Sequence, residues 1–241
     1  MSLTLFLDKL KSRKQQIIVE EQKGLNVIVY DNTETEPDTI FEWPLQAQAL
    51  IHDEAKRGSL TWWWKIGSIL QMAKQNADIV IEAEDWEGAL ANVLDEANGK
   101  RINNLQFWGH GNAGRMYMNG VPVTVNNFSL TNKRNLIDDF LHELRLLLSP
   151  SSYVWFRGCS CFFGETGQRF ALGARDFFNC NIVSHTYIIH ALQSGTHILG
   201  PGDQISWTTS EGGVTEETGM SKLGEPNTIL ATQFWPGGKN K

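Results

Sequence analysis

The chain has 241 residues, of which 41% are hydrophobic and 20% charged, and its formal net charge is −6. This size and composition are typical of one large globular domain or two small ones. Nucleic acids and anionic membranes attract concentrated positive charge, and the sequence has no block of Lys and Arg residues. We therefore expect neither as a standing partner.

The lack of a recognisable targeting signal and the number of cysteines predict a cytoplasmic protein. No stretch approaches the 18 or so apolar residues of a membrane span, and the start of the chain turns charged after a very short apolar run. The three cysteines are Cys159, Cys161 and Cys180. An odd number in a chain of this length suits a reducing compartment better than a disulfide framework, so at least one thiol should be free.

Strand-like and helix-like segments alternate along the chain. Short apolar runs rich in β-branched and aromatic residues predict strands over residues 25–30, 77–81, 104–108, 153–156 and 181–184. Apolar residues spaced by about 3.6 predict helices over 60–75, 86–97, 136–148 and 170–178. This alternation predicts an α/β fold, a three-layer sandwich with a mostly parallel central sheet covered by helices on both faces.

The remaining segments give weaker signals. Residues 1–24 are expected to form an N-terminal helical segment ahead of an α/β domain over 25–241. Between residues 109 and 125, a Gly-rich stretch and the pair Asn119-Gly120 predict a small β-ribbon. The domain's C-terminal part, from about residue 190, stays unassigned, and only 228–234 looks like a late strand.

Three consecutive tryptophans, Trp62, Trp63 and Trp64, lie on the first predicted helix of the domain. Neighbouring side chains on a helix point about 100° apart, so the three indoles cannot all face one core. They indicate either a wide buried helix face or an aromatic anchor for a partner.

Two reactive side chains follow predicted strands beside glycines. In open α/β sheets, ligands bind beyond the carboxyl ends of the strands. His110 follows the strand that ends at Trp108, and Cys159 follows the strand that ends near Phe156. An imidazole next to a thiol increases its thiolate fraction, so His110 is a candidate general base and Cys159 a candidate nucleophile. The backbone N–H groups of Gly111 and Cys159 are candidate oxyanion donors.

These two motifs carry a resemblance to a known family. An apolar strand ending in His-Gly, followed 49 residues later by a cysteine after a second strand and a small residue, resembles the caspase-like cysteine peptidases of clan CD. Within that clan, the stretches 108–120, 148–159 and 164–171 are most similar to bacterial domains of unknown function. The resemblance covers about residues 25 to 186.

The resemblance implies a caspase-like fold and a cysteine endopeptidase that acts on a peptide or protein substrate. It implies His110 as general base, Cys159 as nucleophile, and Gly111 with Cys159 as backbone oxyanion donors. It implies no metal and no cofactor. A residue that selects the substrate's side chain does not carry over from the family; Asp176, Asp203 and Arg157 are considered, and none is assigned. The oligomeric state stays undetermined.

Four other interpretations remain open. The first is a caspase-like fold kept as a catalytically silent binding or structural module. The second is an α/β-hydrolase with a cysteine nucleophile, which would need a histidine later in the chain, namely His185, His190 or His197. The third is a metal site built from the three cysteines and His185, although the Cys159-x-Cys161 spacing is unusual for zinc. In the fourth, Cys159 and Cys161 are a redox-sensitive pair.

Overall fold

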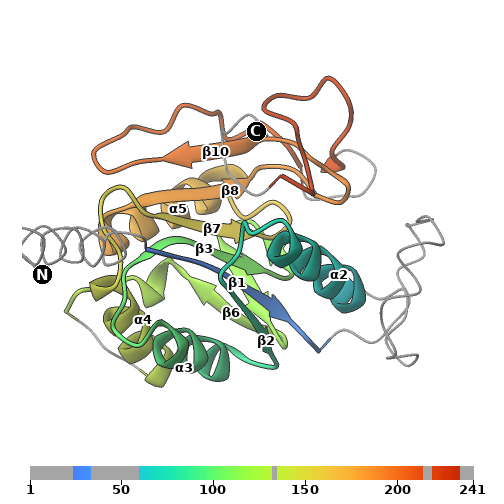
Figure 1. Cartoon of the computed structure of the whole chain (residues 1–241). Coiled ribbons are helices and arrows are strands. Elements are labelled where there is room, and N and C mark those ends of the chain that lie inside the picture. Colours follow the sequence, from blue (N-terminus) through green and yellow to red (C-terminus); the bar gives the residue numbers. More distant parts are fainter. Residues whose placement is uncertain (1–23, 34–59, 132–134, 214–218, 234–241) are drawn as a thin grey trace, which may run out of the picture.

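The computed structural model describes residues 24–33, 60–131, 135–213 and 219–233. The expected N-terminal helical segment, residues 1–24, therefore lies outside the described residues except for its last one. Within the described part, four helices and a central sheet form the framework of the fold (Figure 1).

The central sheet has six strands in the order β10-β8-β7-β3-β1-β2. Five of them run parallel, and the edge strand β10 pairs antiparallel with β8. The prediction of a mostly parallel sheet is confirmed. The strands are β1 (Leu25–Asp31), β2 (Ile79–Ala83), β3 (Ile102–Trp108), β7 (Tyr153–Arg157), β8 (Asn181–His185) and β10 (Thr196–Leu199).

Helices flank both faces of this sheet, as predicted (Figure 1). Apolar side chains of α3 (Trp86–Ala97), α4 (Leu136–Leu146) and α5 (Gly164–Phe178) join one large core with alternate residues of the central strands, such as Val27 and Phe107. The opposite face, which includes Ile28 and Trp108, packs against α2 (Leu60–Ala73). The two faces follow from the alternation of side chains along each strand.

Local stop and turn signals form as the sequence predicts. Asn98 ends α3 in the left-handed conformation, with φ 46°. Asn119 and Gly120 both have positive φ, 50° and 73°, as a tight hairpin turn requires. They join β5 (Arg115–Met118) to β6 (Val121–Thr124), and β4 (Gly111–Asn112) completes the three-stranded ribbon.

The C-terminal part departs from the expectation. The sequence leaves the part from about residue 190 unassigned, but β10 adds a sixth strand to the sheet there. The late strand expected over 228–234 shrinks to β11 (Ile229–Leu230), which pairs antiparallel with β9 (Leu192–Gln193). Edge strands of two to four residues are too short to show a period-2 pattern, and long-range pairing decides whether they form. Among the described helices, none is both long and apolar enough to cross a membrane.

The start of α5 is packed too tightly for any side chain at Gly167. A Cβ built there would lie 2.2 Å from the carbonyl carbon of Phe162, which belongs to the turn after Cys159. Real Cβ atoms do not approach backbone atoms so closely, so this glycine allows α5 to begin directly against that turn.

We expect Gly167→Ala to destabilise the protein by about 1–3 kcal/mol, because the added methyl group must push the Phe162 backbone away. This loss should exceed the helix-propensity gain of Ala over Gly, which is at most about 1 kcal/mol. Urea denaturation measures the difference in unfolding free energy. Arg169→Ala, at an exposed position of the same helix, is the control and should change stability by less than about 0.5 kcal/mol. Equal stability of the two variants would contradict the packing argument.

Candidate active site

The sheet brings the two predicted site loops together. β3 and β7 are adjacent and parallel, with Trp108 opposite Arg157. His110 and Cys159 each follow two residues after these paired positions, so both side chains emerge at the same end of neighbouring strands. The strands predicted over 104–108 and 153–156 are therefore neighbours in the sheet.

The two side chains line one pocket of about 160 Å³. Three parts of the chain enclose it: the strand ends with their loops, helix α2, and the segments around residues 189–193 and 231–232. The wall from α2 is largely apolar and includes Trp63, Trp64 and Leu70. The second and third tryptophans of the Trp62–Trp64 run thus face the candidate site, while Trp62 is buried with 3% of its surface exposed.

The backbones of the two loops touch without intervening side chains. A Cβ built at Gly111 would lie 2.6 Å from the carbonyl oxygen of Cys159 and 2.8 Å from its nitrogen. A Cβ built at Gly158 would lie 3.1 Å from the Cα of Gly111. Glycine at both positions therefore permits this close approach. The assignment of the Gly111 and Cys159 N–H groups as oxyanion donors stays a prediction, although the two residues are neighbours in space.

The Cys159 thiol is partly buried. Its Sγ lies 3.8 Å from the main-chain oxygen of Ile189, to which the S–H group can donate a weak hydrogen bond. Burial raises the pKa of Cys159, because the charged thiolate loses hydration. At neutral pH the resting side chain is therefore a thiol, and a base has to take its proton.

The residue after Cys159 holds the turn that presents the thiol. Ser160 has φ 53°, the left-handed region that a serine rarely adopts. Its N–H donates to the Tyr187 oxygen at 2.9 Å and its hydroxyl donates to the Gly213 oxygen at 2.8 Å. These two hydrogen bonds from separate segments stabilise a strained backbone at the candidate nucleophile.

His110 is also partly buried and is held from two sides. Its main-chain oxygen accepts a hydrogen bond of 2.8 Å from the N–H of Tyr117 in the ribbon. Its ring lies edge-on to the indole of Trp64, with 5.6 Å between the centroids. The β-ribbon and α2 together fix the position of this imidazole.

The three later histidines have different surroundings. His185 is fully buried: Trp155 donates an indole N–H to its Nε2 at 3.2 Å, and the Thr196 hydroxyl lies 3.1 Å from its Nδ1. Burial, and then the positive charge of Arg157, lower the pKa of His185 well below its usual value, which favours the neutral ring. His197 contacts Glu211 at 2.5 Å and stacks on Trp207.

Neither His185 nor His197 lines the pocket, but His190 does. The structure therefore reduces the three candidates of the α/β-hydrolase interpretation to one. His190 is a second imidazole in the pocket of Cys159. The sequence does not distinguish it from His185 and His197 as a candidate base, because no strand-end motif precedes it.

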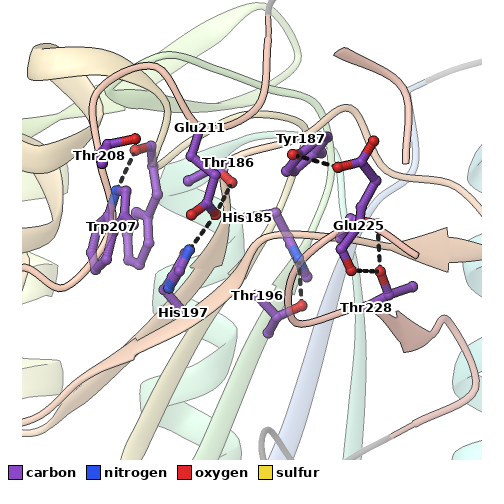
Figure 2. A network of polar contacts seen from close by, with 12 residues as sticks. His185, Thr186, Tyr187, Thr196, His197, Trp207, Thr208, Glu211, Glu225 and Thr228 are labelled. Carbon is purple, nitrogen blue, oxygen red and sulfur yellow. Dashed lines mark hydrogen bonds and ion pairs between the residues drawn. The ribbon is translucent and has the colours of Figure 1, made fainter. Parts of the chain in front are cut away.

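A polar network connects the C-terminal segments to the end of β8, as Figure 2 shows. The Glu211 carboxylate accepts from the Thr186 hydroxyl at 2.9 Å as well as contacting His197. The Tyr187 hydroxyl donates to Glu225 at 2.8 Å. This network anchors the loops that follow β10 beside the Ser160 turn. Its polar side chains are hydrogen-bonded to one another and do not line the pocket.

Arg157 lines the pocket, and the sequence does not predict that its charged side chain is buried. It is 4% exposed, and its guanidinium carbon lies over the rings of Trp108 and Trp155, 4.9 and 4.3 Å from their centroids. It donates to the side-chain oxygens of Gln193 and Gln106 and to the Ala231 carbonyl. Burial lowers its pKa to about 9, so it stays charged at neutral pH.

The two aspartates considered as selectivity residues lie outside the pocket lining. Asp176 is exposed on α5 and pairs with Arg175 at 2.6 Å. Asp203 accepts the N–H of Gly200 at 2.8 Å within a loop. Among the described residues, no three His, Cys, Asp or Glu side chains lie together in a group that could hold a metal ion.

We expect Cys159 to be the most reactive of the three thiols. Cys161 and Cys180 are completely buried, and desolvation raises the pKa of each to about 12. Cys159 is less buried and lines the pocket. Limited alkylation with iodoacetamide and peptide mapping should label it first, at a rate that rises with pH above neutrality because its own pKa is raised. Preferential labelling of Cys180 would contradict this ranking.

Comparisons with known proteins identify no relative of this chain. No family model matches the sequence, no curated protein matches it, and no solved structure matches the fold.

Proposed function

We propose that the protein is a cysteine endopeptidase with a caspase-like fold, in which His110 is the general base and Cys159 the nucleophile. One observation carries this proposal: the ends of two adjacent parallel strands bring an imidazole and a partly buried thiol into the same pocket. The pocket is lined largely by apolar residues, and the two loops that supply the dyad touch through glycines.

The proposed reaction needs only groups of this chain. His110 takes the proton of the Cys159 thiol as the sulfur attacks the scissile carbonyl carbon. The carbonyl oxygen becomes an oxyanion that accepts hydrogen bonds from the N–H groups of Gly111 and Cys159. When the C–N bond breaks, the His110 imidazolium gives its proton to the leaving amine. Water then attacks the thioester carbon and His110 takes a proton from it. The C–S bond breaks, the acid product leaves, and the His110 imidazolium returns the proton to the Cys159 sulfur.

The electrostatics favour general-base catalysis over a preformed thiolate–imidazolium pair. Burial raises the pKa of Cys159, so proton transfer and attack on the carbonyl have to be coupled. The edge contact with Trp64 keeps the His110 ring in a fixed orientation for this transfer.

The same facts give some support to a second function, a binding module without turnover. A protonated thiol with a hydrogen bond to the Ile189 oxygen is a stable resting arrangement. An apolar pocket at the ends of strands β3 and β7 would bind a peptide segment even if Cys159 never reacted.

Substitution of the dyad separates the two functions. With a mixed peptide library as substrate and new amino termini counted by mass spectrometry, Cys159→Ala and His110→Ala should each reduce cleavage by at least about a thousandfold. Both variants should melt within a few degrees of the wild type, because the two side chains lie at the edge of the core. Members of a dyad act as a unit, so the double variant should cleave the library no more slowly than either single variant.

Two further histidine variants complete the test. His190→Ala removes the other imidazole of the pocket, and His142→Ala, on α4 away from the pocket, is the matched control. Loss of cleavage in His190→Ala but not in His110→Ala would transfer the role of base to His190. Absence of cleavage by the wild-type protein over the whole library would reject the peptidase and leave the binding module.

A further inference from the structure

The pocket next to Cys159 indicates what kind of side chain it holds. The proposed function does not depend on this question, because the dyad would act on any acyl group placed before it. The answer rests on the pocket walls, which α2 supplies for the most part, and on the chemistry of Arg157 in the lining.

The walls are apolar and rigid. Trp63, Trp64 and Leu70 come from one face of α2, and Ile189 and Ala191 face them from the segment after β8. α2 lies close to the sheet because Gly67 faces Trp108: a Cβ built at Gly67 would lie 2.8 Å from the indole ring. The helix therefore approaches the strand ends closely enough for its tryptophans to reach the loop of His110.

The pocket lining also contains Arg157, whose hydrogen-bonding groups are mostly occupied by neutral acceptors. Arg157 uses four of its five N–H groups on Gln193, Gln106 and the Ala231 carbonyl, and its guanidinium also contacts the indole rings of Trp108 and Trp155. One N–H of Nη1 remains, so a carboxylate could accept two hydrogen bonds from Arg157 only by displacing one of these acceptors, which would leave a buried polar atom without a partner. The other permanent cation of the lining, Lys74, is exposed at the rim, where water and salt screen it.

Apolar contact is therefore the main interaction that this pocket can make with a ligand. We propose that it is a specificity pocket for a large apolar side chain, leucine or phenylalanine, on the substrate residue whose carbonyl Cys159 attacks. This inference rests on the proposed function for the identity of that carbonyl, but binding of the side chain itself requires no reaction.

Calorimetry on the full-length Cys159→Ala variant tests binding without turnover. The probes are the blocked peptides acetyl-Ala-Ala-X-amide, with X as Leu, Phe, Ala, Asp or Lys. Removing methylene groups from a ligand of an apolar pocket costs at least about tenfold in affinity. We expect the Leu and Phe peptides to bind at least about tenfold more tightly than the Ala, Asp and Lys peptides.

A matched pair of variants on α2 locates the effect. Leu70 and Met72 are both exposed apolar residues of this helix, but only Leu70 lines the pocket. In the same background, Leu70→Ala should reduce the preference for Leu over Ala at least about threefold, and Met72→Ala should leave it unchanged. Because both side chains are at the surface, neither substitution threatens folding.

Three results would overturn the inference: equal affinity for the Leu and Ala peptides, tightest binding of the Asp or Lys peptide, or no binding of any peptide at millimolar concentration. Failure of the proposed function is recognised separately, by the absence of cleavage with wild-type protein. A peptidase that prefers Asp would keep the function and lose this inference, whereas an inactive protein that prefers Leu would keep the inference and lose the function.

Discussion

Burial of the Arg157 guanidinium is the constraint on which the site depends. A charge removed from water is expensive unless hydrogen bonds and aromatic faces replace the hydration. Here the replacements come from four parts of the chain: Gln106 of β3, Gln193 of β9, the Ala231 carbonyl, and the rings of Trp108 and Trp155. The arginine therefore stays stable inside only while all of these segments are in place.

This arrangement couples the C-terminal segments to the dyad. Arg157 lies two residues before Cys159 and Trp108 lies two residues before His110, so the group that anchors β9 and the 229–232 segment also fixes the ends of β3 and β7. The pocket gains its far wall from the same contacts. Replacing Arg157 would leave several buried acceptors unpaired at once, so the loss of stability would exceed that of one hydrogen bond.

Much of the framework could be predicted from the sequence, because strong local patterns and the final structure agree. The stop at Asn98, the hairpin turn at Asn119-Gly120 and the strand ends before His110 and Cys159 depend on local chemistry that a single sequence reveals. The adjacency of β3 and β7 also follows from general rules for parallel sheets. These features are enough to bring His110 and Cys159 to the same edge of the sheet.

The rest depends on contacts between distant segments, which leave no periodic signal. β10 and β11 are two to four residues long and form only because β8 and β9 pair with them. The burial of Arg157 could not be predicted, because its acceptors lie on segments as far apart as Gln106 and Ala231. The difference between Trp62, which is buried, and Trp63 and Trp64, which face the pocket, depends on the angle at which α2 meets Trp108.

The contribution of residues 229–232 to the pocket has a consequence for biosynthesis. A ribosome releases the chain from its N-terminus, and β1, β2, β3, β7 and β8 all emerge before this segment does. Until Ala231 has left the exit tunnel, Arg157 lacks one of its acceptors and the pocket lacks one of its walls. A sheet that held only these strands would place the thiol and the imidazole at one edge with the cleft around them incomplete, so the finished site requires nearly all of the described chain.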